Sequence, residues 1–246
     1  MVPRLRVAQV RGLATVFVAA VGGIVLLTGC GGTSKVSAAS LHSRLAPESV
    51  APGFHLERTL DLTDPVNLVV EGIHLPERTH PSQAVSEVTS SGFEGAAGED
   101  LNQGGPMGTT ITTGVAKFSS AANATKFRNW MHSQDLEQPC FAQCIFSPIN
   151  LPAPGIPGAV AVRQLPTPAA VAAAGPPPAV VAALKARGIK LPGPPPGAQN
   201  GPPTNYLAEF TIGKYVYFAG TSGGTSAQFL TGLKKYYNDV SKLSSS

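Results

Sequence analysis

Three cysteines are the most reactive side chains of this 246-residue chain, and their spacing is informative. Cys30 closes an apolar run near the N-terminus, whereas Cys140 and Cys144 lie close together in the middle of the chain. In an oxidising compartment such a pair predicts a disulfide that closes a short loop. Two free thiols, a redox couple and half of a metal site are the alternatives. Redox motifs place two residues between their thiols, and this pair has three, so the disulfide is the favoured interpretation.

The segment before Cys30 has the organisation of a secretory signal. Arg4, Arg6 and Arg11 form a basic region without an acidic residue, and an apolar run follows from Leu13 to Leu27. The run has about fifteen residues, which is shorter than the ~20 that a membrane-spanning helix needs. The segment therefore predicts export through a signal peptide and not a membrane span.

The end of this run, Leu27, Thr28, Gly29 and Cys30, resembles the lipobox of bacterial lipoproteins. The resemblance implies transfer of diacylglycerol to the Cys30 thiol, cleavage before Cys30 and acylation of the new amino group. It thus implies a signal peptide at residues 1–29 and a lipid anchor on the extracytoplasmic face of the cell membrane. An ordinary cleaved signal with Cys30 nearby is the alternative. The remainder is generally similar to exported lipoproteins of high-GC Gram-positive bacteria, which include lipid carriers and sensor-like ectodomains.

The other chemistry-bearing residues predict no reaction. The chain has no nucleophile elbow, phosphate-binding Walker loop, dinucleotide fingerprint or zinc-protease motif. Residues 221–226 are glycine-rich and precede a helix, but they lack the lysine of a phosphate loop, so a helix cap explains them. No two histidines have helical metal-ligand spacing, and Asp61 and Asp64 fit turn hydrogen bonds better than a calcium site. We therefore expect no catalytic residue, no metal site and no cofactor.

Charge argues against nucleic acid as a partner. Three of the 18 basic residues lie in the signal segment, which leaves 15 basic against 14 acidic residues and no basic cluster. Only 13% of the residues are charged, and the chain has 27 glycines and 23 prolines. This composition predicts one modest core with long irregular connections.

Two stretches share a plan of strand, turn, strand and capped helix. The first has strands near 93–102 and 109–118 and a helix that Ser119 can cap. The second has strands near 205–212 and 215–219 and a helix in which Thr225 and Gln228 have capping-box spacing. Two such β-β-α units predict an α+β fold, with an antiparallel sheet and helices packed on one face. A duplication would account for their similarity. A strand or docked edge segment near 66–75, a short helix near 82–91 and a strand within 156–165 complete the expected elements.

The domain organisation follows from composition. Residues 30–52 are small and polar and predict a lipidated flexible tether, and residues 53–246 predict a single α+β domain. Residues 139–203 contain 16 of the 23 prolines. We expect a proline-rich surface insertion at about 166–204, with at most a short helix near 178–187. It is either an inert linker or a segment that contacts a partner.

The thin inventory of acid-base and nucleophilic groups favours a non-enzymatic role. We expect a lipid-anchored binding or interaction lipoprotein at the cell surface, attached to the membrane by its lipid. Its ligand would be a small molecule, a lipid or an envelope protein. An envelope structural or assembly factor and an exported hydrolase are the alternatives.

Overall fold

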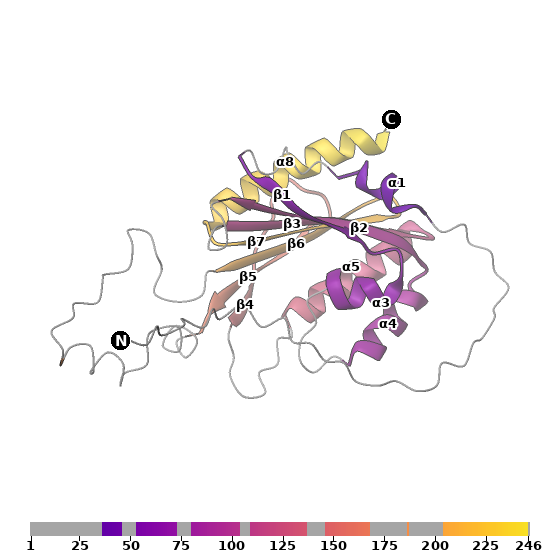
Figure 1. The fold of residues 1–246 in the computed structure, drawn as a ribbon, viewed down its shortest axis with the longest axis horizontal. Coiled ribbons are helices and arrows are strands. Elements are labelled where there is room, and N and C mark those ends of the chain that lie inside the picture. Colours follow the sequence, from indigo (N-terminus) through magenta and orange to yellow (C-terminus); the bar gives the residue numbers. More distant parts are fainter. Residues whose placement is uncertain are drawn as a thin grey trace, which may run out of the picture. The chain divides into compact units, whose positions relative to one another are not determined.

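The computed structural model describes residues 36–45, 53–72, 80–103, 109–136, 146–167, 186 and 204–245. A seven-stranded sheet in the order β1-β2-β3-β7-β6-β5-β4 forms the centre of this part of the chain, and every neighbouring pair is antiparallel (Figure 1). The strands are β1 (His55–Asp61), β2 (Phe93–Gln103), β3 (Thr109–Phe118), β4 (Phe146–Asn150), β5 (Val160–Pro166), β6 (Asn205–Ile212) and β7 (Tyr215–Ser222). The helices are α1 (Ala38–His42), α3 (Pro65–Asn67), the π-helix η1 (Leu68–Gly72), α4 (Pro81–Ser90), α5 (Ala121–Leu136) and α8 (Ser226–Ser245).

The two faces of the sheet carry separate hydrophobic cores. On the aromatic face, α1 and α8 cover a cluster that includes Phe210, Tyr217 and Tyr236. On the cavity face, η1, α4 and α5 cover a cluster that includes Phe118 and Phe127. Figure 1 shows α8 and α1 on one side of the sheet and α3, α4 and α5 on the other.

The α+β class and the antiparallel sheet are confirmed, but the helices lie on both faces of the sheet and not on one. The physical reason is that consecutive residues of the central strands are buried. Side chains alternate between faces along a strand. Val115 and Ala116 in β3, and Tyr217 and Phe218 in β7, are buried although each pair consists of neighbours. Both faces therefore need a cover.

Both β-β-α units are present, but their helices lie on opposite faces of the sheet. Strands β2 and β3 precede α5, and strands β6 and β7 precede α8. Strands β3 and β7 pair antiparallel at the centre of the sheet. A two-fold axis normal to the sheet would superpose the hairpins and would put both helices on the same face. Because α5 and α8 lie on opposite faces, no such axis relates the two complete units.

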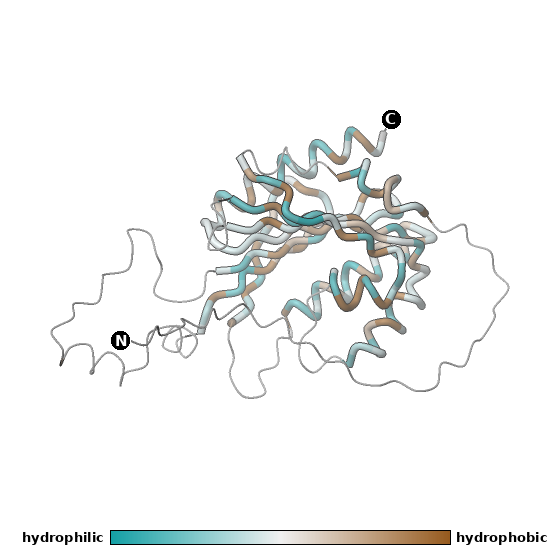
Figure 2. Tube along the Cα trace, in the orientation of Figure 1, coloured by the Kyte–Doolittle hydropathy of each residue, from teal (hydrophilic) through white to brown (hydrophobic). Residues whose placement is uncertain are grey.

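Local signals located the hairpins and the last helix correctly. Gly213 has φ +57° in the turn between β6 and β7, as a two-residue hairpin with glycine first requires. The predicted capping box is formed, because the Gln228 backbone N–H donates to Thr225 Oγ1 at 3.2 Å and the Thr225 N–H donates to Gln228 Oε1 at 2.9 Å. Apolar and polar residues alternate along α8 (Figure 2). Helix α5 begins one residue later than expected, with Ser120 Oγ accepting from the Asn123 N–H at 3.1 Å.

Several segments differ from the sequence-based expectation, among them β4 (Phe146–Asn150), where no strand was expected. The predicted strand near 66–75 is helical from Pro65 to Gly72, because the Asp64 carboxylate caps it by accepting from the Val66 N–H at 2.7 Å. Strand β1 was not predicted, since five of its seven residues before Leu60 are exposed and show no alternation. The described part of the expected tether, residues 36–45, packs on the aromatic face through buried Leu41 and Leu45. Most of the expected insertion at 166–204 lies outside the described residues.

Candidate functional site

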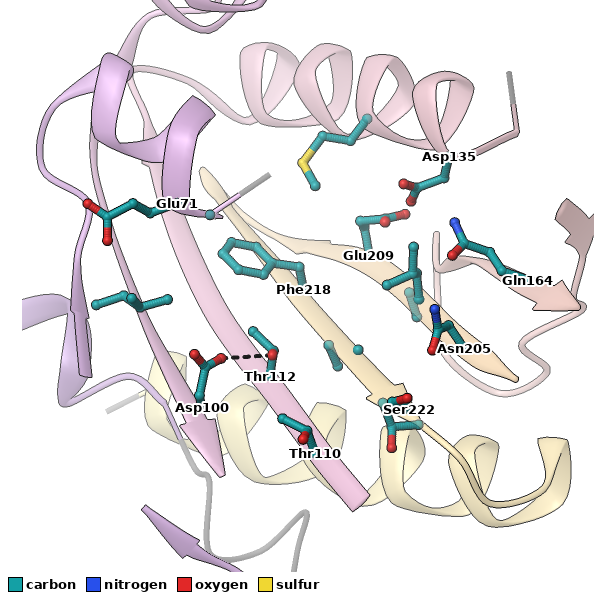
Figure 3. A pocket seen from close by; sticks show the side chains of 18 of the residues that line it. Glu71, Asp100, Thr110, Thr112, Asp135, Gln164, Asn205, Glu209, Phe218 and Ser222 are labelled. Carbon is teal, nitrogen blue, oxygen red and sulfur yellow. Dashed lines mark hydrogen bonds between the residues drawn. The ribbon is translucent and has the colours of Figure 1, made fainter. Parts of the chain in front are cut away.

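A cavity of about 440 Å³ lies on the cavity face of the sheet. Strands β1, β2, β3, β7, β6 and β5 contribute to its floor, and η1 and α5 form opposite walls (Figure 3). Ligand cavities in proteins usually measure roughly 300–1,000 Å³. Its apolar lining comes from Leu60, Val70, Met131, Leu207, Ala208, Phe218 and Ala219. Its polar lining includes Arg58, Glu71, Asp100, Thr110, Thr112, Asp135, Gln164, Asn205, Glu209 and Ser222.

Glycines shape the floor of this cavity. A Cβ atom on Gly114 would lie 1.9 Å from Cε2 of Phe218, so the Phe218 ring lies across β3 where the side chain is missing. Gly220 on β7 lines the cavity, and a Cβ there would lie 3.1 Å from Cδ2 of Leu207. Glycine in a strand interior commonly marks such a close approach. The two glycines thus leave room for the side chains of Phe218 and Leu207 to lie close to the sheet.

A pair of buried carboxyl groups forms the polar wall of the cavity beside α5. Asp135 lies near the end of α5 and Glu209 lies in β6, and their side chains are 8% and 2% exposed. The two carboxyl groups interact with each other, and each affects the pKa of the other. Figure 3 shows them side by side at the edge of the cavity.

Burial controls the ionisation of this pair. Loss of hydration raises the pKa of Asp135 to about 6, against the opposing effect of its hydrogen bond with Glu209. Burial, followed by the charge of Asp135 and the hydrogen bond with it, raises the pKa of Glu209 well above its usual range, and the Arg128 charge opposes this. Two adjacent carboxylates in an apolar setting resist double ionisation. Loss of the last proton from the pair is therefore disfavoured, and the two carboxyls share one proton.

Two polar atoms beside this pair lack a hydrogen-bond partner among the described residues. They are Oε2 of Glu209 and Nε2 of Gln164, whose side chains are only 2% and 3% exposed. Both residues line the cavity. A buried polar atom without a partner costs roughly 1–3 kcal/mol, so each one requires an explanation, and a bound ligand would supply a partner.

The charged groups elsewhere on the lining are paired or distant from this wall. Arg58 contacts Asp100 at 2.9 Å, and the Thr112 hydroxyl donates to Asp100 Oδ1 at 2.8 Å. Glu71 belongs to η1, the opposite wall (Figure 3). The charges of Arg58 and Asp100 therefore neutralise each other, whereas no cation of the described lining neutralises the Asp135–Glu209 pair.

Among the described residues that the sequence singled out, Thr221 and Ser222 line this cavity, and Asp61 and Asp64 do not. Leu27, Thr28, Gly29, Cys30, Cys140 and Cys144 lie outside the described residues, so the lipid anchor and the disulfide stay predictions. Residues 221–226 form the exit of the last hairpin and the cap of α8. Asp61 and Asp64 accept backbone N–H groups, from Thr63 and Val66, as expected of turn residues. Within the described ranges, no three His, Cys, Asp or Glu residues could hold a metal ion together.

Sequence reasoning missed Asp135 and Glu209. Ala208, Phe210 and Ile212 alternate on one face of β6, which suggests solvent on the other face, where Glu209 lies. The overlooked signal is the hairpin partner, because Glu209 pairs with Phe218, a large apolar residue on the same face. An apolar residue opposite a carboxylate in a central strand indicates that this second face is buried as well.

A smaller cavity of about 260 Å³ lies between the sheet and the start of α8. Gly223, Gly224, Thr225, Gln228 and Phe229 contribute to its lining. Its polar side chains at the helix terminus already serve the capping box. We therefore take the larger cavity as the candidate site.

Comparison with known proteins identifies the fold and no family. No family model matches the sequence, and no curated protein matches it. Among solved structures, the chain is similar to the extracellular domain of PknH from Mycobacterium tuberculosis, with a TM-score of 0.50 and 11% sequence identity. The match covers 86% of this chain and 100% of that domain. None of the helices within the described ranges is both long enough and apolar enough to span a membrane. The chain thus shares its α+β fold with an extracellular domain.

Proposed function

We propose that this chain is a lipid-anchored extracytoplasmic binding protein that holds a small ligand in the cavity between η1 and α5. The cavity is the observation that carries the proposal, because it combines an apolar floor with a few converging polar groups. Two further observations support the location. The sequence ends its apolar leader in Leu27-Thr28-Gly29-Cys30, and the similar solved structure is an extracellular domain.

Cys30→Ala tests the anchor. The wild-type protein should partition into detergent and carry the added mass of its acyl chains, since each buried methylene contributes ~0.8 kcal/mol to membrane binding. The variant should remain an unprocessed precursor or enter the medium. Thr33→Ala, three residues further on, is the matched control and should partition like the wild type. Unchanged mass and partitioning of Cys30→Ala would refute the lipid anchor.

Native mass spectrometry of protein purified from its own host tests the cavity. We expect a bound small molecule on the wild type and its loss in Thr110→Trp, which fills the cavity from β3. Thr59→Trp is the matched control, because Thr59 is an exposed strand residue that does not line the cavity. Equal occupancy in the two variants would place the ligand elsewhere and would contradict the proposal.

An exported hydrolase is the second candidate, and the Asp135–Glu209 pair is the observation that favours it. Paired carboxyls whose pKa values are raised can act as general acid and base. Glycosidase carboxyls, however, lie roughly 5–10 Å apart so that the scissile bond fits between them, and here the two side chains lie side by side. A co-purified molecule that is released chemically altered by the wild type and unaltered by Asp135→Asn would establish the hydrolase.

A further inference from the structure

The charges that line the cavity are unevenly distributed. Within the described lining, Arg58 is the one cation, against four carboxyl-bearing residues: Glu71, Asp100, Asp135 and Glu209. Arg58 is already paired with Asp100 at 2.9 Å. The polar wall therefore offers an anionic ligand no free cation within the described lining, and it offers a cationic ligand two adjacent carboxyl groups.

The unpartnered Glu209 oxygen points to the same class of ligand. Oε2 of Glu209 can only accept a hydrogen bond when the carboxyl is ionised, and it lacks a donor among the described residues. The Gln164 amide beside it has an acceptor oxygen, whereas its unpartnered Nε2 is a donor that needs an acceptor. Figure 3 places Gln164, Asp135 and Glu209 together at one end of the cavity. A group with several N–H donors would satisfy the acceptor oxygens at this end, and Gln164 Nε2 would take its acceptor from water or from another part of the ligand.

The rest of the cavity favours an apolar body. Leu60 and Phe218 lie on the floor, Leu207 lies beside Gly220, and Met131 lies on the α5 wall. An ammonium group has three donors and no acceptor, which complements acceptors grouped at one end. Charge-assisted hydrogen bonds of this kind are about twice as strong as neutral ones.

We infer that the ligand of this cavity is an amphiphilic amine, whose ammonium group binds Asp135 and Glu209 and whose apolar body lies over Phe218 and Leu207. The inference rests on the proposed binding function and names the chemical class of its ligand. A metal ion fits this end poorly, because no group of three His, Cys, Asp or Glu ligands exists among the described residues.

Binding is coupled to the proton that the pair holds. The free pair shares one proton and has a net charge of about −1 at neutral pH. When the ammonium ion R–NH₃⁺ enters, its donors replace that proton, both carboxyls ionise, and one H⁺ leaves to solvent. No covalent bond to the ligand forms or breaks.

The neighbouring charges on each packed element permit this exchange. On α5, Arg128 donates to the Gly158 carbonyl, and its charge favours ionised Glu209. His132 on the same helix stays neutral, because burial and then the Arg128 charge lower its pKa. Glu71 lines the cavity from η1, and the mutually neutralised Arg58–Asp100 pair lines it from β1 and β2. Rising pH should therefore strengthen binding through the Asp135–Glu209 pair.

Isothermal titration with three probes of equal chain length tests the inference on the full mature chain. The probes are n-octylamine, octan-1-ol and octanoate at pH 7.5. We expect n-octylamine to bind at least about tenfold more tightly than octan-1-ol, and octanoate to bind more weakly than either, since a hydrogen bond to a charged group contributes that much. Titrations in two buffers of different ionisation enthalpy should show close to one proton released per amine bound.

Asp135→Asn and Glu209→Gln keep the side-chain volume and remove the acidic group. Each should weaken n-octylamine binding by about tenfold or more, while octan-1-ol binding is retained. Glu209→Gln should also abolish proton release, whereas in Asp135→Asn the buried Glu209 carboxyl still has a proton to release. Retained octan-1-ol binding also shows that the variant is folded. Glu57→Gln is the matched control, because Glu57 is an exposed residue of β1 that does not line the cavity.

The outcomes separate the inference from the proposed function. Equal binding of amine and alcohol, or amine binding that Asp135→Asn and Glu209→Gln leave unchanged, overturns the amine inference and leaves the cavity as a binding site. Binding that prefers octanoate overturns it in the same way. No binding by any probe, together with no ligand on the host-purified protein, overturns the inference and the proposed function together.

Discussion

The two faces of the sheet differ, because one carries a packed aromatic core and the other carries a cavity. On the aromatic face, the rings of Phe210 and Tyr217 stack with centroids 5.3 Å apart, and the Tyr236 ring meets each of them edge-on. On the cavity face, the same two strands carry Glu209 and Phe218, which line a 440 Å³ hollow. Because side chains alternate between the faces along β6 and β7, neighbouring residues belong to the aromatic core and to the cavity lining.

The difference indicates how such a small domain can tolerate a buried acidic pair. A buried ionisable group is costly in an apolar setting, so the surrounding strands must be held by other contacts. Helix α8 supplies them from the opposite face, with Leu233, Tyr236 and Val240 all buried against the sheet. Rigid strands supported from behind are the usual way to hold a preorganised site.

The largest expected effect comes from truncating the aromatic face. Phe210→Ala removes a ring that is fully buried among Tyr217, Tyr236 and Tyr237 and should lower the free energy of unfolding by about 3–5 kcal/mol. Leu207→Ala, on the same strand but half-buried at the cavity, should cost about 1–2 kcal/mol, because no packed core is emptied. Urea unfolding of both variants measures the difference. Equal losses would mean that the two faces are equally packed.

The next prediction concerns the pH dependence of folding stability, to which the buried carboxyls of the cavity face contribute. Folding raises the pKa of Asp135 from 3.8 to about 6, so the folded protein binds more protons than the unfolded chain between these values. Stability contributed by this group is complete below pH 4 and is lost as pH rises through 6. The loss amounts to at most about 3 kcal/mol.

Unfolding of wild type and Asp135→Asn between pH 4 and pH 7.5 measures this contribution. The wild type minus the variant should fall steadily with rising pH, and the raised pKa of Glu209 should extend the decline above pH 6. Glu57→Gln should leave the wild-type profile unchanged. A difference that stays constant across the range would show that Asp135 titrates as an exposed carboxyl.

Much of the fold could be predicted from sequence because its signals are local. Thr225 and Gln228 mark the start of α8, and Gly213 marks a hairpin turn, each within a few residues. The placement of α5 on the face opposite α8 could not be predicted in this way. It depends on which side of the sheet each helix enters, which no spacing within either unit records.

The candidate site was missed for the same reason. Asp135 comes from the end of a helix and Glu209 from a strand that follows a long proline-rich stretch, so no motif links them. Only their meeting on the cavity face gives them a shared proton. The lipobox residues show the opposite case, because Leu27 to Cys30 are contiguous and a processing enzyme would read them as a short sequence.

The smallest expected effect on stability tests how the cavity acquires its shape. Gly114→Ala places a methyl group where the Phe218 ring now lies, with Cε2 only 1.9 Å away. Because Phe218 borders open space, its ring can swing into the cavity, so we expect a loss of only about 1–2 kcal/mol. The same movement should fill part of the cavity and reduce octan-1-ol binding. Urea unfolding and calorimetric titration measure the two effects separately.

The control is Gly98→Ala, because Gly98 pairs with Gly114 across the strands and lies on the same face. A Cβ at Gly98 would lie 3.2 Å from the Thr113 carbonyl oxygen and 3.4 Å from Leu60 Cδ1, and no atom of the Phe218 ring lies as close. This variant should therefore leave octan-1-ol binding near the wild-type level. Phe218→Leu combined with Gly114→Ala should recover much of the lost stability and binding, since the shorter side chain no longer competes for the same space. Loss of binding in Gly98→Ala but not in Gly114→Ala would show that Leu60, and not Phe218, controls the shape of the cavity.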